Sequence, residues 1–340
     1  MIDERQRHRE DATGAGRPKR VFMLGATGTI GRATTAALIE RGHQVVCFLR
    51  SRRSGPGEPP NLPDAVEVRL GDVSDPDSPA RDGFRGERFD AVMSCMASRT
   101  GVPADAWAVD HRAHVNVLEA AKAAGVGQFV LLSAICVQKP RLAFQHAKLT
   151  FEAELMTSGL TWSIVRPTAY FKSLSGQVER VRAGKPYLIF GDGTLTACKP
   201  ISDRDLATYL ADCLDDPLLH GRILPIGGPG PAMTPRDQGE ALFALLGRTP
   251  RFSRVPPAML DVISGLLGLV GALAPPLAAK AELARIGRYY ATESMLVLDP
   301  DTGLYDAEAT PEFGGDTLAD FHARLIRGET SIDLGDQAVF

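Results

Sequence analysis

A short hydrophobic segment, residues 21–24, runs directly into a stretch in which Gly25, Gly28 and Gly31 recur. Residues 33–41 then carry hydrophobic side chains at helical spacing. This order of strand, glycine turn and helix is typical of a dinucleotide-binding turn. Gly25 would permit the tight turn, Gly28 would let backbone N–H groups approach a pyrophosphate, and Gly31 would let the helix pack closely on the strand.

The phosphates of a dinucleotide would lie at the amino end of that helix, where unpaired N–H groups and the helix dipole favour an anion. The G-x-x-G-x-x-G spacing resembles that of short-chain dehydrogenases/reductases and differs from the G-x-G-x-x-G of other dinucleotide folds. An ordinary glycine-rich loop is the alternative, which the strand and helix on either side disfavour. We predict that the turn binds the cofactor through Gly25, Thr27, Gly28, Thr29, Ile30 and Gly31.

The composition is that of an ordinary soluble globular protein, with 44% hydrophobic and 23% charged residues among 340. A net charge of -3 gives no reason to expect a nucleic acid as partner. The cysteines number five, an odd count, and none stands in a C-x-x-C pair. We therefore expect a reduced, cytoplasmic compartment and no metal site.

Strand-like and helical segments alternate along most of the chain, which predicts an α/β fold of the Rossmann type: a doubly wound parallel sheet with a smaller C-terminal substrate-binding region. We expect a disordered tail at 1–19, an NADP-binding core at 20–165, a substrate-binding region with returning core elements and a helical lid at 166–327, and a tail at 328–340. The predicted strands are 21–24, 43–49, 66–70, 91–95, 129–133, 162–165 and 223–226.

The hydrophobic run 258–274 lies between two pairs of prolines. It is slightly short for a membrane-spanning helix and is interrupted by Asp261 and glycines. We expect a buried or pocket-lining helix. The second interpretation is a peripheral contact with a membrane surface.

The end of the second predicted strand is basic, because Arg50, Arg52 and Arg53 follow one another closely. An NAD enzyme usually carries an acidic residue here for the ribose hydroxyls, whereas an arginine suits a 2′-phosphate. We predict NADPH as cofactor, with Arg50 as its ligand. At the end of the third strand, Asp72 and Val73 are expected to flank the adenine, and a turn or helix cap is the alternative role for Asp72.

In short-chain dehydrogenases a serine ends the fifth strand, and a Tyr-x-x-x-Lys pair follows on the next helix. This sequence has Ser133 in the first place, but Phe144 stands where the tyrosine would be, four residues before Lys148. The two share a helix face, so Lys148 can reach the nicotinamide ribose. A carbonyl or alcohol substrate needs an acid or base on its oxygen, which that phenol normally supplies. An alkene conjugated to a large π system has no such oxygen.

The residues around this pair, and many beyond them, closely resemble the NADPH-dependent divinyl chlorophyllide 8-vinyl-reductases of chlorophyll and bacteriochlorophyll synthesis, which are atypical, NmrA-like short-chain dehydrogenases/reductases. The phenylalanine at the tyrosine position is itself the pattern of that family. The resemblance covers roughly residues 20 to 335. It rests on LLSAICVQKP (131–140), FQ and AKL (144–149), FEAELM (151–156), SIVRPTA (163–169), FKSL (171–174), FGDG (190–193), CKPIS (198–202), LPIGGPG (224–230) and IGRYYA (286–291).

The resemblance implies reduction of the ring-B vinyl group of a divinyl chlorophyllide, or of a related magnesium porphyrin, to ethyl. We expect hydride delivery to the outer vinyl carbon, spreading of the carbanion into the macrocycle, and protonation of the inner carbon. Lys148 would orient the cofactor and assist electrostatically, with Ser133 beside it. The proton donor is left open between Lys148, His146, Tyr170 and water.

The second half of the chain would supply the pigment pocket. Aromatic side chains can stack against a flat macrocycle, and core packing is the alternative role for each. Basic side chains can pair with the propionate of the pigment, and a solvated surface charge is the alternative. The residues considered are Tyr170, Phe171, Tyr187, Phe190, Tyr289 and Tyr290 for stacking, and Lys172, Lys199 and Arg288 for the propionate. As substrate-binding residues we select Phe144, Phe171, Lys172, Tyr187, Arg288 and Tyr289.

Two other functions are compatible with these motifs. The first is an NmrA-like sensor that binds the dinucleotide without turning it over. The second is a reductase of another conjugated alkene. A peripheral attachment to a photosynthetic membrane through 258–274 would accompany the leading hypothesis.

Overall fold

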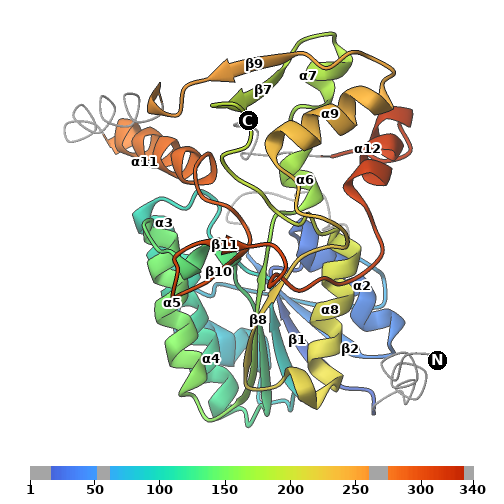
Figure 1. The fold of residues 1–340 in the computed structure, drawn as a ribbon. Coiled ribbons are helices and arrows are strands. Elements are labelled where there is room, and N and C mark those ends of the chain that lie inside the picture. The colour runs from blue at the N-terminus through green and yellow to red at the C-terminus, as the bar shows by residue number, and fades with distance from the viewer. Residues whose placement is uncertain (1–16, 52–61, 260–274, 333–340) are drawn as a thin grey trace.

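The computed structural model describes residues 17–51, 62–259 and 275–332. A seven-stranded sheet stands at the centre of the molecule, in the order β3-β2-β1-β4-β5-β6-β8, and every neighbouring pair is parallel (Figure 1). All seven predicted strands are confirmed, and so is the doubly wound α/β fold. The strands are β1 (Arg20–Leu24), β2 (Gln44–Arg50), β3 (Glu67–Gly71), β4 (Ala91–Ser94), β5 (Gln128–Leu132), β6 (Thr161–Pro167) and β8 (Arg222–Ile226).

Helices cover both faces of this sheet because its strands are apolar on both sides. In β1, Val21 and Met23 join a core cluster that holds α2 (Thr29–Glu40) and α8 (Asp203–Asp215). The alternate residues Phe22 and Leu24 join the opposite cluster, under α4 (His114–Ala123) and α5 (Ala143–Met156). The remaining helical segments near the sheet are η1 (Pro79–Phe84), α3 (Pro103–Ala106), η2 (Trp107–Ala113), η3 (Ile135–Gln138) and η4 (Pro217–Leu219).

A smaller unit lies above the carboxyl ends of the strands (Figure 1). Its core joins Val178, Tyr187 and Leu242 with Phe243 and Leu325. A two-stranded parallel sheet and three helices form it, while two short strands and two further helices connect it to the main sheet. These elements are β7 (Tyr187–Phe190), β9 (Phe252–Val255), α7 (Val178–Arg182), α9 (Pro235–Leu245) and α12 (Leu318–Arg327), then β10 (Val297–Leu298), β11 (Tyr305–Asp306), α6 (Phe171–Leu174) and α11 (Pro275–Tyr290).

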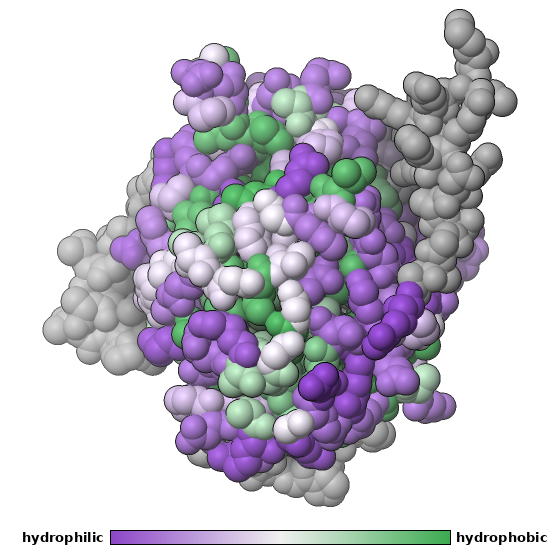
Figure 2. All heavy atoms as spheres, turned by 90° about the horizontal axis from the view of Figure 1, so that it is seen from below, coloured by the Kyte–Doolittle hydropathy of each residue, from purple (hydrophilic) through white to green (hydrophobic). Residues whose placement is uncertain are grey.

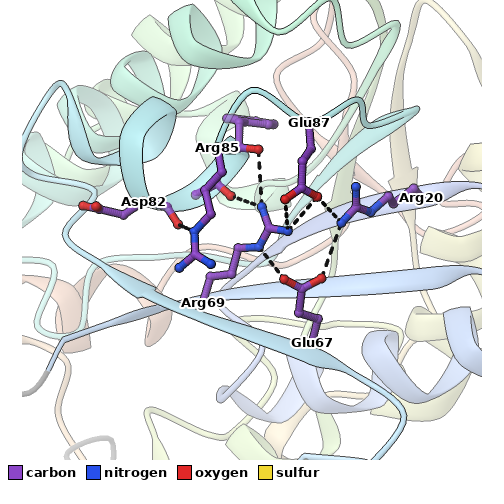
Figure 3. Close-up of polar contacts among 8 residues, drawn as sticks. Arg20, Glu67, Arg69, Asp82, Arg85 and Glu87 are labelled. Atoms are coloured by element: carbon purple, nitrogen blue, oxygen red, sulfur yellow. Dashed lines mark hydrogen bonds and ion pairs between the residues drawn. The ribbon is translucent and has the colours of Figure 1, made fainter.

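The edge strand β3 is fastened by a buried arginine that the sequence analysis did not single out (Figure 3). All five N–H donors of Arg69 are used: on Glu67, on both carboxylate oxygens of Glu87, and on the backbone carbonyls of Gly83 and Phe84. The guanidinium ties the strand to the segment behind η1 through bidentate pairing, the strongest form of such contacts. It thereby fixes the end of the sheet that precedes Gly71.

The opposite end of the molecule, where the strands begin, is a mosaic of hydrophilic and smaller hydrophobic areas (Figure 2). None of the helices in the described ranges combines the length and the hydrophobicity that a membrane crossing needs. Several predictions concern residues outside those ranges: most of both tails, Arg52, Arg53, and nearly all of the hydrophobic run 258–274 with its lid and membrane interpretations.

Candidate active site

The strand order reverses between β1 and β4, which opens a crevice at their carboxyl ends, the usual place for a dinucleotide in an open α/β sheet. Gly25 lies at the end of β1 with a φ of 73°, a conformation that favours glycine. A Cβ atom there would lie 2.6 Å from the carbonyl carbon of Cys95. Gly25 is therefore required both by its backbone angle and by the close approach of the chain after β4.

The other two glycines have different neighbours. A Cβ atom on Gly31 would lie 2.0 Å from the carbonyl oxygen of Gly25, so Gly31 lets α2 pack on the turn. A Cβ atom on Gly28 would meet only that same oxygen, at 3.4 Å. Thr27 and Gly28 are exposed, and the first turn of α2 carries no acidic residue. The open face at Gly28 and the unpaired N–H groups of the helix end fit the pyrophosphate of a dinucleotide.

A test of this site is Gly28→Ala. Gly28 has a φ of -73°, which alanine adopts freely, so we expect the melting temperature to change little. The added methyl would occupy the surface that a pyrophosphate approaches, and we expect NADPH affinity to fall by about 10-fold or more. Fluorescence titration with NADPH measures this. Gly31→Ala is the contrasting variant, expected to disturb folding itself. Unchanged NADPH affinity in Gly28→Ala would remove the phosphate site from this turn.

Lys148 lies on the inner side of α5 and forms an ion pair with Asp110, with 3.0 Å between Nζ and Oδ1. The Asp110 side chain is fully buried on η2, and its Oδ1 also accepts a hydrogen bond of 3.1 Å from the backbone N–H of Ser98. Its Oδ2 has no partner within the described chain. Asp110 thus joins the lysine to the loop after β4, which borders the crevice.

The side chain of Ser133 contacts a second buried group, the carboxylate of Glu152. Its hydroxyl donates a hydrogen bond of 2.5 Å to Oε1 of Glu152, which in turn pairs with Arg166 at the end of β6. Glu152 follows Lys148 by one helical turn on the same face of α5. The role of Ser133 in catalysis stays a prediction; in this structure its hydroxyl donates to Glu152, which holds β5, α5 and β6 together.

Tyr170 lies between the end of β6 and α6, half-buried. Burial raises the pKa of its phenol, and the neighbouring thiols of Cys95 and Cys136 act in the same direction. The hydroxyl has no hydrogen bond to any residue that the structure describes. The result is a neutral phenol near the ends of β4 and β5, on the side of the sheet where the glycine turn lies.

A small apolar pocket opens between the turn after β7, the start of α9 and the end of α11. Tyr290 is 43% exposed and Leu195 50% exposed, which is unusual for large apolar side chains. The Tyr290 hydroxyl lies 3.8 Å from Sγ of Cys136, which links the pocket to the loop after β5. The lining consists of Phe190, Gly193, Leu195, Thr196, Pro235, Gly287, Tyr290 and Ala291.

Comparison with known proteins agrees with this geometry. Residues 25–217 match a family model described as NAD(P)H-binding. The chain is 50% identical over 331 residues to the chloroplastic divinyl chlorophyllide a 8-vinyl-reductase of Oryza sativa subsp. indica, covering 94% of this chain and 82% of that one. This chain belongs to the divinyl chlorophyllide a 8-vinyl-reductase family. It therefore carries an NAD(P)H-binding domain.

Solved structures of lower identity share the fold of this 8-vinyl-reductase homologue. Isoflavone reductase superposes with a TM-score of 0.63 at 18% identity, covering 91% of this chain and 99% of that one. The NADPH-dependent quinone oxidoreductase of Escherichia coli, solved with NADPH, gives 0.62 at 20% identity, covering 90% and 99%. At this identity they show the fold alone.

The predicted ligands of the adenosine half lie together at one edge of the crevice in this family member. Arg50 is exposed at the end of β2, in register with Gly71 of β3. The carboxylate of Asp72 accepts hydrogen bonds from the backbone and hydroxyl of Ser74, as a turn residue does. The carbonyl of Val73 accepts a hydrogen bond from Asn116 of α4. These roles toward the cofactor stay predictions.

Several predicted substrate residues have structural roles. The Tyr289 hydroxyl hydrogen-bonds the carbonyls of Cys136 and Lys139, and Lys199 pairs with Glu312. Tyr187 and Phe171 are buried, the first against Phe252 and the second against Phe321. Their contact with the substrate stays a prediction, and in this structure each side chain is used in packing. Arg288, half-buried beside Gly287 of the pocket, stays a prediction.

Three further predictions concern α5 and α6. His146 is exposed and two residues from Lys148, so the two side chains leave the helix on nearly opposite sides. The role of His146 as a proton donor stays a prediction, which this placement does not support. Phe144 is 9% exposed and packs in the cluster beneath α11. Lys172, expected at the propionate, instead lies against the glycine turn, 3.3 Å from the Thr29 hydroxyl.

Asp110 was not among the predicted site residues, although the sequence carries a signal for it. Residues 106, 110, 113 and 117 form one buried stripe of the helical segment, and Asp110 is the charged member of it. A carboxylate in such a stripe needs a charged or hydrogen-bonding partner. Lys148 is that partner.

Proposed function

We propose that this chain reduces the 8-vinyl group of divinyl chlorophyllide, or of a related magnesium porphyrin, to ethyl with NADPH. The observation that carries the proposal is the 50% identity to a named 8-vinyl-reductase along 94% of the chain. The site supports it independently: Lys148 borders the crevice, while Phe144 stands at the position of the usual catalytic phenol. An oxygen-free substrate group such as a vinyl has no need of that phenol.

Bound NADPH would supply the hydride that adds to one vinyl carbon. The chain's own residues hold the cofactor: the glycine turn and the amino end of α2 take the pyrophosphate, and Lys148 takes the nicotinamide ribose. Asp110 keeps the ammonium of Lys148 in place and balances its charge. The role of Lys148 is therefore chiefly orientation, which lessens the electrostatic assistance expected from the sequence.

The second hydrogen of the ethyl group is a proton, and we assign its donation to Tyr170. Its phenol is kept neutral by burial and makes no hydrogen bond within the described chain. Lys148 is engaged with Asp110, and His146 faces away. The phenolate left after transfer would regain its proton from solvent, since Tyr170 is only half-buried.

The pigment would rest against the apolar pocket at the end of α11. Tyr290 and Leu195 offer exposed apolar surface there, and Arg288 adjoins it as a partner for a propionate. An apolar pocket with one charged group at its rim suits a flat macrocycle that carries a carboxylate.

The preference for NADPH over NADH is tested with Arg50→Ser. A charge-assisted bond to the 2′-phosphate contributes about 1.5–3 kcal/mol, so NADPH affinity should fall about 10- to 100-fold while NADH affinity stays the same. Titration with both cofactors measures the ratio, and Arg182→Ser, at an exposed arginine of α7, is the control. An equal loss for NADPH and NADH would contradict a role at the 2′-phosphate.

The activity itself is tested by anaerobic incubation of the protein with NADPH and divinyl chlorophyllide. We expect a blue shift of the Soret band and a mass gain of two hydrogens. Binding of NADPH without any shift would favour the non-catalytic sensor. Turnover of other conjugated alkenes in a substrate panel, with none of the pigment, would favour a related reductase.

A further inference from the structure

Lys172 reaches the glycine turn from a distant part of the sequence. It belongs to α6, which follows the sixth strand of the sheet, and its Nζ lies 3.3 Å from Oγ1 of Thr29. Thr29 is the first residue of α2, a helix of 12 residues. An ammonium thus stands beside the helix end that carries the unpaired N–H groups.

Two positive features meet at this point. The amino end of a helix carries a partial positive charge of about half an elementary charge, and a lysine beside it is repelled. No acidic residue lies in the first turn of α2, and Lys172 has no ion pair with a carboxylate of the described residues. The arrangement becomes favourable when an anion occupies the exposed surface at Thr27 and Gly28.

The segment that carries Lys172 is held from two sides. The backbone N–H of Phe171 donates to the carbonyl of Ile201, with 3.2 Å between the atoms. At the other end of α6, Ser175 donates to the carbonyl of Phe171 and accepts a hydrogen bond of 3.0 Å from His322 of α12. The lysine is therefore a fixed part of the crevice wall and not a loose surface charge.

We propose that Lys172 binds the pyrophosphate of the nicotinamide dinucleotide. It supplies the full positive charge that the glycine turn, with its backbone donors alone, does not have. The inference rests on the proposed use of a dinucleotide and goes beyond it: the half of the chain expected to bind substrate also holds the phosphates. It replaces the prediction that Lys172 pairs with the carboxylate of the pigment.

The experiment compares Lys172→Met with Lys172→Arg and with Lys185→Met, a variant of an exposed lysine. Affinities for NADPH, NADH and 2′-AMP are measured by titration without pigment, so the result does not depend on turnover. We expect Lys172→Met to weaken NADPH and NADH by the same factor, about 10-fold. Binding of 2′-AMP, which lacks a pyrophosphate, should stay unchanged, and Lys172→Arg should bind both cofactors nearly as the wild type.

Two results would overturn the proposal. If Lys172→Met leaves both cofactor affinities unchanged and raises the KM for the pigment, the lysine binds substrate. If it weakens NADPH and 2′-AMP but not NADH, the lysine binds the 2′-phosphate. Calorimetry measures the melting temperatures of Lys172→Met and Lys172→Arg separately from cofactor binding. We expect no fall in the melting temperature of Lys172→Met, because methionine keeps the length of the half-buried stem.

Discussion

Replacing Lys148 with methionine is expected to lower kcat for pigment reduction by about 100-fold or more. The lysine borders the crevice and is held by Asp110, with 3.0 Å between Nζ and Oδ1. If it fixes the nicotinamide ribose, its loss lets the reacting carbon drift, and a displacement of about 1 Å costs about 100-fold in rate. Steady-state kinetics with saturating NADPH and divinyl chlorophyllide measure this directly.

The same substitution also leaves the buried carboxylate of Asp110 without its cation. Breaking a buried pair costs about 3–5 kcal/mol, so the single variant is expected to be less stable as well as slow. Lys148→Met combined with Asp110→Asn removes both charges and should regain much of the stability while remaining slow. Full turnover in that double variant would show that Lys148 has no part in the reaction.

Tyr170→Phe separates orientation from proton donation in the same assay. The variant keeps the ring and removes the hydroxyl, so cofactor affinity should be that of the wild type. A slower turnover with unchanged NADPH binding supports the phenol as donor, whereas unchanged turnover assigns the proton to water.

The second large expected effect is a loss of folding stability at acid pH. Burial lowers the pKa of His114 to about 4, with Lys148 acting in the same direction and Asp110 in the opposite one. Burial also lowers the pKa of His322 to about 4. The neutral ring satisfies both of its contacts, because Nδ1–H donates to the carbonyl of Val109 and Nε2 accepts from the hydroxyl of Ser94. Both histidines therefore stabilise the fold as neutral groups.

The direction of the pH dependence follows from the lowered pKa values. In the unfolded chain each histidine becomes protonated near pH 6.5, whereas in the folded chain each becomes protonated only near pH 4. Their contribution is fully present above pH 6.5 and is lost as the pH falls toward 4. At about 1.4 kcal/mol for each pH unit, each costs about 3 kcal/mol across that range, a large part of a typical folding free energy.

Urea unfolding at several pH values between 7 and 5 measures this loss before most carboxylates titrate. His114→Gln with His322→Gln should be less stable at pH 7 but should show a flatter dependence on pH. His146→Gln, at an exposed histidine, is the control and should follow the wild type. A midpoint that does not move between pH 7 and 5 in the wild type would contradict the buried neutral state.

The sheet could be predicted from sequence because its signals are local. Each strand is a short apolar run beside a turn, and the alternation with helices determines that neighbours are parallel. The helix caps Ser202 and Thr234 are equally local features, because the side chain of each accepts a hydrogen bond from the backbone N–H three positions on. These features depend on neighbours within a few residues.

The partners of charged side chains could not be predicted, because they come from distant segments. Arg69 depends on Glu87, Lys148 on Asp110, and Lys172 on Thr29. A lysine or arginine in a sequence gives no sign of which element will face it after folding. The parallel pairing of β7 with β9, which residues 191–251 separate in the sequence, was missed for the same reason.

The roles of the aromatic residues could not be assigned from the sequence. Stacking on a macrocycle and packing in a core require the same side chains, so composition cannot distinguish them. Tyr187, Phe171 and Tyr289 proved to be buried, whereas Tyr290, next to Tyr289 in sequence, is 43% exposed at the pocket. The helical turn of α11 decides which of the two neighbours faces outward.

The five cysteines are all free thiols, and burial raises the pKa of each. The pKa of Cys47 is about 11, and those of Cys95, Cys198 and Cys213 are about 12. Because the thiolate is the reactive form, reagents that alkylate thiols find almost no thiolate to attack in the folded chain at neutral pH. The rate at which such a reagent labels this protein therefore measures how often its buried cysteines become exposed by unfolding. The measurement needs no introduced probe.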